Sequence, residues 1–353
     1  MAVYVIFGMF FILTAIVNVG RRIDKKIIGF LFAFEIIMLW IIISFRACGY
    51  DYYSYQEWYA WMKNGNWVMG SAMIGSELGY AWLNNVALNY RMVIIVMATL
   101  TIGCYAVSIW KLSPMPLFSL FLLLSYTVYP GLMGQYRQAL ACSVFFVSLL
   151  FVYDRKIFSI VVLFGSLFHY TLFICLLVLF MPKKIMKSKG YISLLIVAFL
   201  CNLLTYNVFV NVSSLFPTVI QYKIDYYRIS EEGLSVGLNM AMVLRVVIFI
   251  LFYLNRNYIS VYKYGSLIFN VYFFSLFFYL ALGFLPQLSI RGTQAFYLAE
   301  IILAAMVVRN AIYYRWAYFL FFLVVGIYRQ VSFFTSEQGM IDYIPYKYIF
   351  NLI

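Results

Sequence analysis

The stretch AVYVIFGMFFILTAIVNVGRRIDKKIIGFLFAFEIIMLWIIISF (2–45) decides the fold class. Its two apolar runs, Ala2–Val19 and Ile27–Phe45, are each long enough for an α-helix to cross a bilayer, which takes roughly 17–25 residues. The whole chain of 353 residues is 66% hydrophobic, 21% aromatic and only 10% charged. Soluble domains are about a quarter charged and could not bury so much apolar surface. This composition excludes a soluble enzyme, a nucleic-acid binder and a secreted disulfide scaffold.

Nine further apolar runs follow the first two. They are Met92–Trp110, Leu117–Tyr129, Ala139–Tyr153, Ile157–Met181, Tyr191–Phe209, Leu238–Leu254, Gly265–Leu285, Ala295–Val308 and Trp316–Tyr328. The sequence therefore predicts an all-α polytopic membrane protein, a single domain over 1–353 with about ten crossings. Outer loops are expected at 46–91 and 210–237, and the amphipathic, aromatic-rich segment Tyr52–Lys63 should lie as a helix in the membrane interface.

Short basic loops set the orientation, because Lys and Arg are enriched on the cytoplasmic side. The connection with Arg21, Arg22, Lys25 and Lys26 should be cytoplasmic, which places both 46–91 and the N-terminus outside. The basic residues of 183–189 would then fall outside if Ile157–Met181 crossed once. A hairpin broken near 168–171 returns these residues to the cytoplasm. The net charge of +13 is then explained by the Lys and Arg residues that set the topology. Such a break would put the only histidine, His169, at its tip.

Four arginines on the expected outer side lie at or near span ends, where short loops usually avoid arginine: Arg46, Arg137, Arg291 and Arg329. Arg137 and Arg291 each precede or open a helix, and a helix N-terminus adds positive potential to the guanidinium, which favours phosphate oxygens. One such arginine could simply reach lipid headgroups. Two together favour phosphate binding.

Ionisable residues inside apolar runs are functional candidates, since they are costly in a membrane. His169 is either a hydrogen-bonded structural group or a catalytic one. Arg245 needs a partner, and Glu35, Glu300 or a lipid phosphate could each provide it. The five cysteines form no CxxC or Cys/His cluster, so neither a disulfide nor a metal is expected.

Five short blocks recur in an order that resembles the EpsG-like polysaccharide polymerases, from about residue 40 to 350. The blocks are Arg-x-x-Gly-x-Asp-x-x-x-Tyr (Arg46, Gly49, Asp51, Tyr55), Glu-x-Gly-Tyr (Glu77, Gly79, Tyr80), Arg-Gln-Ala-Leu-Ala (Arg137–Ala141), Leu-Phe-His (Leu167–His169) and Pro-Tyr-Lys (Pro345–Lys347).

The resemblance implies a Wzy-type polymerase of O-antigen or exopolysaccharide repeat units, a GT-C-like membrane glycosyltransferase whose site faces the periplasm or exterior from a bacterial inner membrane. Its donor and acceptor would be glycans on undecaprenyl pyrophosphate. Further expected partners are membrane lipid, a chain-length regulator and a flippase, but no nucleic acid. Catalysis would need no cofactor and no metal, because arginines hold the leaving pyrophosphate and no Asp-x-Asp pair is present.

The candidate site residues fall into two groups. The general-base candidates are Asp51, Glu77 and His169. The residues expected to bind pyrophosphate or sugar are Arg46, Tyr55, Arg137, Gln138, Arg291, Arg329, Tyr346 and Lys347.

Three rival functions remain open from the sequence. A lipid-linked oligosaccharide flippase would need polar groups through both membrane halves, whereas charge here concentrates on the outer half. An O-acyltransferase would use an intramembrane His169 but gives no reason for the outer arginines. An O-antigen ligase shares the physical logic and is separated only by the motifs.

Overall fold

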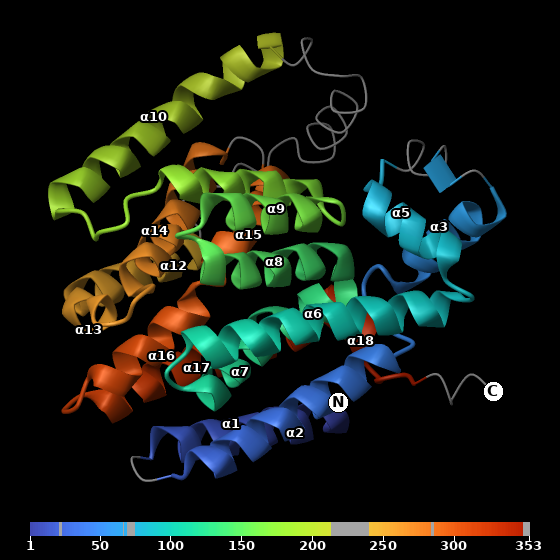
Figure 1. The fold of residues 1–353 in the computed structure, drawn as a ribbon, viewed down its shortest axis with the longest axis horizontal. Helices are drawn as coiled ribbons and strands as arrows, with labels where there is room; N and C mark the ends of the chain where they lie inside the picture. The colour runs from blue at the N-terminus through green and yellow to red at the C-terminus, as the bar shows by residue number, and fades with distance from the viewer. Residues whose placement is uncertain (21–22, 66, 69–74, 213–239, 284–285, 349–353) are drawn as a thin grey trace. The chain divides into compact units, whose positions relative to one another are not determined.

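The structure is a computed structural model that describes residues 1–20, 23–65, 67–68, 75–212, 240–283 and 286–348. Helices dominate these residues, which form no β-strand and a single isolated bridge between Arg46 and Tyr348 (Figure 1). The chain separates into two compact units: Met1–Leu176 with Ile301–Ile353, called unit 1, and Leu177–Glu300, called unit 2. The single domain expected from the sequence stays a prediction.

Unit 1 contains most of the long helices. They are α1 (Ala2–Val19), α2 (Lys25–Ser44), α3 (Tyr52–Asn64), α5 (Leu78–Val86), α6 (Tyr90–Leu112), α7 (Pro116–Leu123), the π-helix η1 (Leu124–Gly134), α8 (Tyr136–Ser148), the 3₁₀ turn η2 (Leu149–Phe151), α9 (Arg155–Ser166), α17 (Arg315–Thr335) and α18 (Glu337–Tyr343). Two elements lie at the boundaries of the units, the 3₁₀-helix η3 (Tyr170–Phe180) and α16 (Glu300–Asn310).

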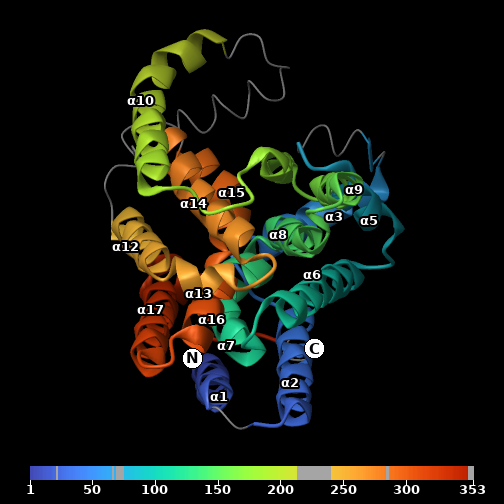
Figure 2. The same cartoon turned by 60° about the vertical axis from the view of Figure 1, so that its left-hand side comes forward.

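Unit 2 is built around α14 (Gly265–Ala281), which contacts each of its other helices. In both views α14 lies beside α15 (Figures 1 and 2). The other helices are α10 (Ser188–Val212), α12 (Met240–Leu254), α13 (Arg256–Ser260) and α15 (Pro286–Tyr297). Most of the expected outer loop 210–237, with Asp225 and Arg228, lies outside the described residues.

The all-α polytopic fold class is confirmed. Among the described residues, six helical segments are long and apolar enough to cross a membrane, and five shorter apolar helices accompany them. The first helix has the bounds expected from the sequence. The expected single run Ala295–Val308 is wrong in its bounds, because the helix starts at Pro286 and is interrupted between Tyr297 and Glu300. There the Ala299 N–H donates to the carbonyl three residues back, a tighter turn than the α-helix allows.

The break expected within Ile157–Met181 is also confirmed. Helix α9 ends at Ser166, the chain turns through Leu167–His169, and η3 begins at Tyr170. The backbone N–H groups of Phe168 and His169 both donate to the Gly165 carbonyl, which closes the turn. The side of the membrane to which η3 leads, and so the number of crossings, stays a prediction.

The most buried span of unit 1 is Pro116–Gly134, which comprises α7 and η1. Every residue of α7 is buried, against α1, α2, α6 and α17. Its first N–H groups have no partner within the helix. The Asn18 side-chain oxygen accepts from two of them, the backbone N–H groups of Leu117 and Phe118, at 3.1 and 3.4 Å. The following π-helix widens the turn, a feature found frequently at functional sites.

The C-terminal segment is hydrogen-bonded to the end of α2 and to the loop between α2 and α3, and we call these contacts the C-terminal clasp. The Ala47 N–H donates to the Lys347 carbonyl at 2.7 Å, and the Gly49 N–H donates to the Asp342 carbonyl at 3.0 Å. The Tyr346 hydroxyl donates to the Ile42 carbonyl at 2.7 Å. Since α3 begins three residues after Gly49, the C-terminal clasp positions the first turn of α3 and, through it, the side chains of this helix.

Gly49→Ala should destabilise the protein strongly. Gly49 has φ +130°, and an added Cβ would lie 2.2 Å from the Met133 carbonyl oxygen, so both strain and a backbone clash result. We expect a fall of at least about 2 kcal/mol in the free energy of unfolding, measured as a lower melting temperature in detergent.

The matched control is Gly103→Ala in α6, where no atom lies within 4 Å of the added Cβ. Alanine in a helix is favoured over glycine by roughly 1 kcal/mol, so the control should melt at the same temperature or higher. Equal melting temperatures for the two variants would contradict the prediction.

Candidate functional site

The centre of the candidate site is an ion pair between Arg137 and Glu77 in unit 1. Arg137 is the second residue of α8, and Glu77 is the residue immediately before α5. Arg137 Nη1 lies 2.7 Å from Glu77 Oε2, and the two side chains are only 14% and 5% exposed. The other oxygen, Oε1, accepts from the Tyr170 backbone N–H at 3.2 Å. Glu77 therefore joins α5, α8 and the start of η3.

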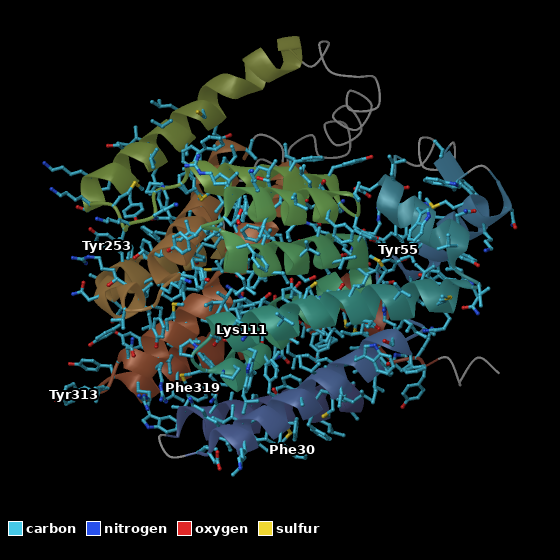
Figure 3. The ribbon with its side chains drawn as sticks, viewed as in Figure 1. Phe30, Tyr55, Lys111, Tyr253, Tyr313 and Phe319 are labelled. Atoms are coloured by element: carbon cyan, nitrogen blue, oxygen red, sulfur yellow. The ribbon has the colours of Figure 1, made fainter. Side chains whose placement is uncertain are left out.

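Three aromatic rings surround the Arg137 guanidinium. Its central carbon lies 5.3 Å from the Tyr55 ring centroid, 4.9 Å from Trp58 and 5.1 Å from Tyr80. Figure 3 labels Tyr55, whose hydroxyl also accepts from Arg137 Nε at 3.4 Å. Each desolvated cation–π contact of this kind contributes on the order of 1–2 kcal/mol. We call Tyr55, Trp58 and Tyr80 the aromatic cage.

The cage is neutral at physiological pH. Burial raises the pKa of the Tyr55 phenol and that of the Tyr80 phenol, since neither has water to stabilise a phenolate. The Tyr80 hydroxyl is 2.7 Å from the Tyr136 hydroxyl, so the rings are tied to α8 as well. Glu77 is thus the charged partner of Arg137, and the rings contribute orientation.

One edge of the guanidinium stays open. Nη1 and Nε are used by Glu77 and Tyr55, whereas Nη2 has no hydrogen-bond partner among the residues that the structure describes. Nη2 is also not sealed from the surface. The arrangement can therefore present one N–H edge of a fixed cation to an incoming anion.

Local sequence explains how these pieces meet. The Gly79 N–H donates to the Leu167 carbonyl at 2.9 Å, and a Cβ on Gly79 would lie 2.8 Å from that oxygen. Glycine is thus required where the Glu-x-Gly-Tyr block touches the Leu-Phe-His turn. On the other side, Lys63 of α3 donates to the Asn85 and Ala87 carbonyls at the end of α5, which holds the two helices together.

His169 lies in the same turn and is partly buried. Its Nδ1 is 2.7 Å from the Thr171 hydroxyl and 3.4 Å from the Thr171 backbone N–H. A backbone N–H can only donate, so Nδ1 acts as an acceptor and the neutral ring carries its proton on Nε2. His169 lies two residues after Leu167, whose carbonyl accepts from the Gly79 N–H. It immediately precedes Tyr170, whose backbone N–H donates to Glu77. The structure thus brings the histidine turn to the ion pair.

Asp51 stands at the start of α3, one turn before the cage. The Tyr55 N–H donates to the Asp51 backbone carbonyl at 3.0 Å, and the Asp51 side chain does not cap the helix. The base candidates Asp51, Glu77 and His169 therefore all belong to segments that contact the cage or the ion pair. Their catalytic roles stay predictions.

Arg46 occupies a different environment. Its side chain is fully buried, with Nε donating to the Met133 carbonyl at 3.0 Å and Nη1 to the Ile43 carbonyl at 2.7 Å. The Arg46 carbonyl in turn accepts from Arg91 Nη1 at 2.6 Å. Arg46 thus ties the end of α2 to η1, and its expected contact with substrate stays a prediction.

The remaining candidates are spread over both units. In unit 1, Gln138 is buried beside Arg137, Lys347 is exposed, and Arg329 lies 3.7 Å above the Tyr126 ring in η1. Tyr346 is buried in the clasp described above. Arg291 lies in α15 of unit 2 and is partly buried. Their substrate contacts are untested.

Sequence reasoning missed Trp58 and Tyr136 as parts of the site. Trp58 follows Tyr55 by three residues and so shares its face of α3, a spacing that could have shown the pair as a platform. Tyr136 immediately precedes Arg137. Among the described residues, no three His, Cys, Asp or Glu side chains are grouped so that they could hold a metal ion.

The fold defines a multi-pass all-α membrane protein. In its candidate site the Arg137 guanidinium is held by Glu77 and the aromatic cage, and Asp51 and His169 lie in segments that contact them. The EpsG family model matches residues 29–348, nearly the whole chain, and the protein belongs to the EpsG family. Membership indicates a polysaccharide polymerase-type membrane protein of the glycosyltransferase kind. Comparisons with curated proteins and with solved structures gave no match.

Glu77→Gln should destabilise unit 1. Breaking a buried ion pair typically costs about 3–5 kcal/mol, and the partial exposure of Arg137 puts this pair at the lower end. The free energy of unfolding in mixed detergent micelles measures the loss. The double variant Glu77→Gln/Arg137→Gln should lose less than the sum of the two single variants, because neither charge is then left alone.

The control for this measurement is Glu57→Gln on α3, where the carboxylate is exposed. It should leave the unfolding free energy within about 0.5 kcal/mol of the parent value. A loss in Glu77→Gln no greater than in this control would show that the ion pair does not hold the site together.

Proposed function

We propose that the protein polymerises oligosaccharide repeat units carried on undecaprenyl pyrophosphate, and thereby builds O-antigen or exopolysaccharide. The reaction takes place at the periplasmic or outer face of a bacterial inner membrane. EpsG family membership supports the polysaccharide class. The observation that carries the proposal is the Arg137 guanidinium, fixed on Glu77 and the aromatic cage with its Nη2 edge open.

The chemistry is a displacement at the anomeric carbon of the donor glycan. The bond from this carbon to the pyrophosphate oxygen breaks, and a bond to the acceptor hydroxyl oxygen forms. The hydroxyl proton passes to a base, and undecaprenyl pyrophosphate leaves as an anion. Charge therefore grows on the pyrophosphate in the transition state, and a preoriented cation stabilises it most.

Arg137 is well suited to this task because it needs no rearrangement to present an N–H edge. It also stands at the N-terminus of α8, where the helix dipole is positive and attracts phosphate oxygens. Arg291, in unit 2, remains a proposed pyrophosphate-binding residue, and in our proposal arginines take the place of a divalent metal. Arg329, Gln138, Tyr346, Lys347 and Arg46 remain proposed contacts or supports of the substrate.

We assign the base role to Asp51, with His169 as second candidate. Both oxygens of Glu77 already accept hydrogen bonds, Oε2 from Arg137 and Oε1 from the Tyr170 backbone N–H. Glu77 therefore acts in this proposal as a positioning residue for Arg137. In this proposal His169 either serves as the base or contacts a phosphate or sugar oxygen of the substrate.

The function is tested first by glycan composition in a strain that lacks the gene. A polymerase defect leaves surface glycan with a single repeat unit. Complete absence of repeats would instead indicate a flippase or a ligase, and glycan of normal length without acyl groups would indicate an O-acyltransferase. The direct test is elongation of purified lipid-linked repeats by the purified protein.

Arg137→Ala should reduce elongation by about 10²–10³-fold, the usual cost of removing one preoriented donor to a developing anion. Arg137→Lys should restore activity only partly, because an ammonium keeps the charge but loses the planar fork. The rate of elongation of purified lipid-linked repeats is the measurement. Melting temperatures of each variant separate a catalytic loss from a folding loss.

A suitable control is Arg155→Ala at the start of α9, an exposed arginine on the expected cytoplasmic side. Its elongation rate should equal that of the parent protein. Parent-like elongation by a folded Arg137→Ala variant would remove Arg137 from the mechanism.

Asp51→Asn should slow elongation by about 10²–10⁴-fold with little change in the binding of lipid-linked repeats, the expected result when a general base is removed. His169→Gln should show a smaller loss. The measurement is kcat and substrate affinity, with Glu57→Gln on the same helix as the control. Normal kcat in Asp51→Asn would move the base role to His169 or to a mechanism driven by leaving-group stabilisation alone.

A further inference from the structure

Arg245 is the one arginine within the α12 span, and unit 2 provides it with an unusual environment. Its side chain is only 9% exposed. The guanidinium carbon lies 4.4 Å from the Tyr279 ring centroid on α14 and 4.2 Å from the Tyr297 ring centroid on α15. Three helices thus contribute to this environment, in which each ring offers a cation–π contact.

Among the residues that the structure describes, no carboxylate forms an ion pair with Arg245. Glu300 belongs to the same unit, but its Oε2 accepts from the Tyr272 hydroxyl at 3.1 Å. The same hydroxyl is 3.3 Å from the Arg245 backbone carbonyl, so Tyr272 stands between the acid and the arginine backbone.

The hydrogen-bond donors of Arg245 are also largely unused. Nη1 donates to the Thr293 hydroxyl at 3.4 Å, and this is the only hydrogen bond of the guanidinium within the described part of the chain. The Thr293 hydroxyl donates in turn to the Ser289 carbonyl at 2.7 Å, so its oxygen is free to accept. No other residue that the structure describes accepts a hydrogen bond from Arg245 Nε or Nη2. A buried charge with open in-plane donors calls for an anion.

We propose that Arg245 binds a phosphate group carried by a membrane lipid. Stacked rings favour approach in the plane of the guanidinium, where its forked N–H groups match two phosphate oxygens. Phosphates are the anions that membrane lipids supply. The lipid is either a bulk phospholipid or the polyprenyl pyrophosphate carrier, and only the second case rests on the proposed function.

This site differs from the one expected at Arg291. Arg245 contacts Thr293 and Tyr297, which are four residues apart and so share one face of α15. Arg291 precedes Thr293 by two residues, about 200° around the helix, and points elsewhere. The site at Arg245 is therefore centred on an arginine from α12 and is separate from the one expected at Arg291.

The test is native mass spectrometry of the full-length protein, purified in a non-ionic detergent and supplied with one lipid at a time. The probes are undecaprenyl pyrophosphate, phosphatidylglycerol and uncharged diacylglycerol. Parent protein should retain one more phosphate lipid than Arg245→Met, whose affinity for that lipid should fall about tenfold or more. Diacylglycerol should not discriminate between them.

The matched control is Arg256→Met in α13. Arg256 also lies on a tyrosine, 4.7 Å from the Tyr253 centroid labelled in Figure 3, but its Nη1 donates to the Tyr253 carbonyl of its own turn. It should retain phosphate lipids like the parent. A preference for undecaprenyl pyrophosphate identifies the carrier as the ligand, and equal retention of both phosphate lipids identifies a general lipid-phosphate site.

Arg245→Lys keeps the proposal falsifiable if Arg245→Met does not fold. Lysine preserves the charge but loses the fork, so retention of the phosphate lipid should fall several-fold. Parent-like retention by a folded Arg245→Met or Arg245→Lys variant would overturn the proposal. The assay contains no acceptor glycan, so lipid binding can succeed while polymerisation fails, and the reverse outcome is equally distinguishable.

Discussion

A guanidinium inside a largely apolar protein must have its charge compensated, and unit 1 is organised around this constraint at Arg137. The ion pair with Glu77 links segments 60 positions apart in the chain. The second oxygen of Glu77 adds the start of η3, and the cage rings add α3. Residues of α3, α5 and the histidine turn also pack into one hydrophobic cluster with α6 and α8, and the ion pair lies beside this cluster.

The same constraint is met differently at three arginines, and the difference separates their roles. Arg46 donates from Nε and Nη1 to two backbone carbonyls, while its buried Nη2 has no hydrogen-bond partner among the described residues. Arg137 is balanced by a carboxylate and keeps one open edge. Arg245 lies over two tyrosine rings and has no ion-paired carboxylate among the described residues, and a lipid phosphate is the compensating group that we propose for it. Arg46 and Arg137 lie near span ends and Arg245 lies inside an apolar run, but these positions in the sequence do not reveal which group compensates each charge.

The sequence correctly predicted the features that depend on residues close together in the chain. Apolar run length placed α1 at its observed bounds, α2 and α6 within two residues, and the amphipathic segment Tyr52–Lys63 at α3. Charge bias placed the break before Tyr170. The π-helix, the C-terminal clasp on Gly49 and the pairing of Glu77 with Arg137 were invisible, because they depend on contacts between segments far apart in the chain. The ordered motifs indicated candidate site residues, but they did not show which of these residues are in contact.

The aromatic residues of α3 and α5 fall into a buried set and an exposed set. Sugar stacking needs an accessible ring face, yet Tyr55 and Tyr80 are almost completely buried and their faces are directed at a guanidinium. Accessible rings on the same two helices are Tyr53, Trp61 and Trp82. The buried set therefore orients the cation, and only the exposed set offers ring faces to a ligand. If the proposed polymerisation holds, changes in the buried rings act through Arg137 on the leaving group, whereas changes in the exposed rings act on contact with glycan or lipid headgroups.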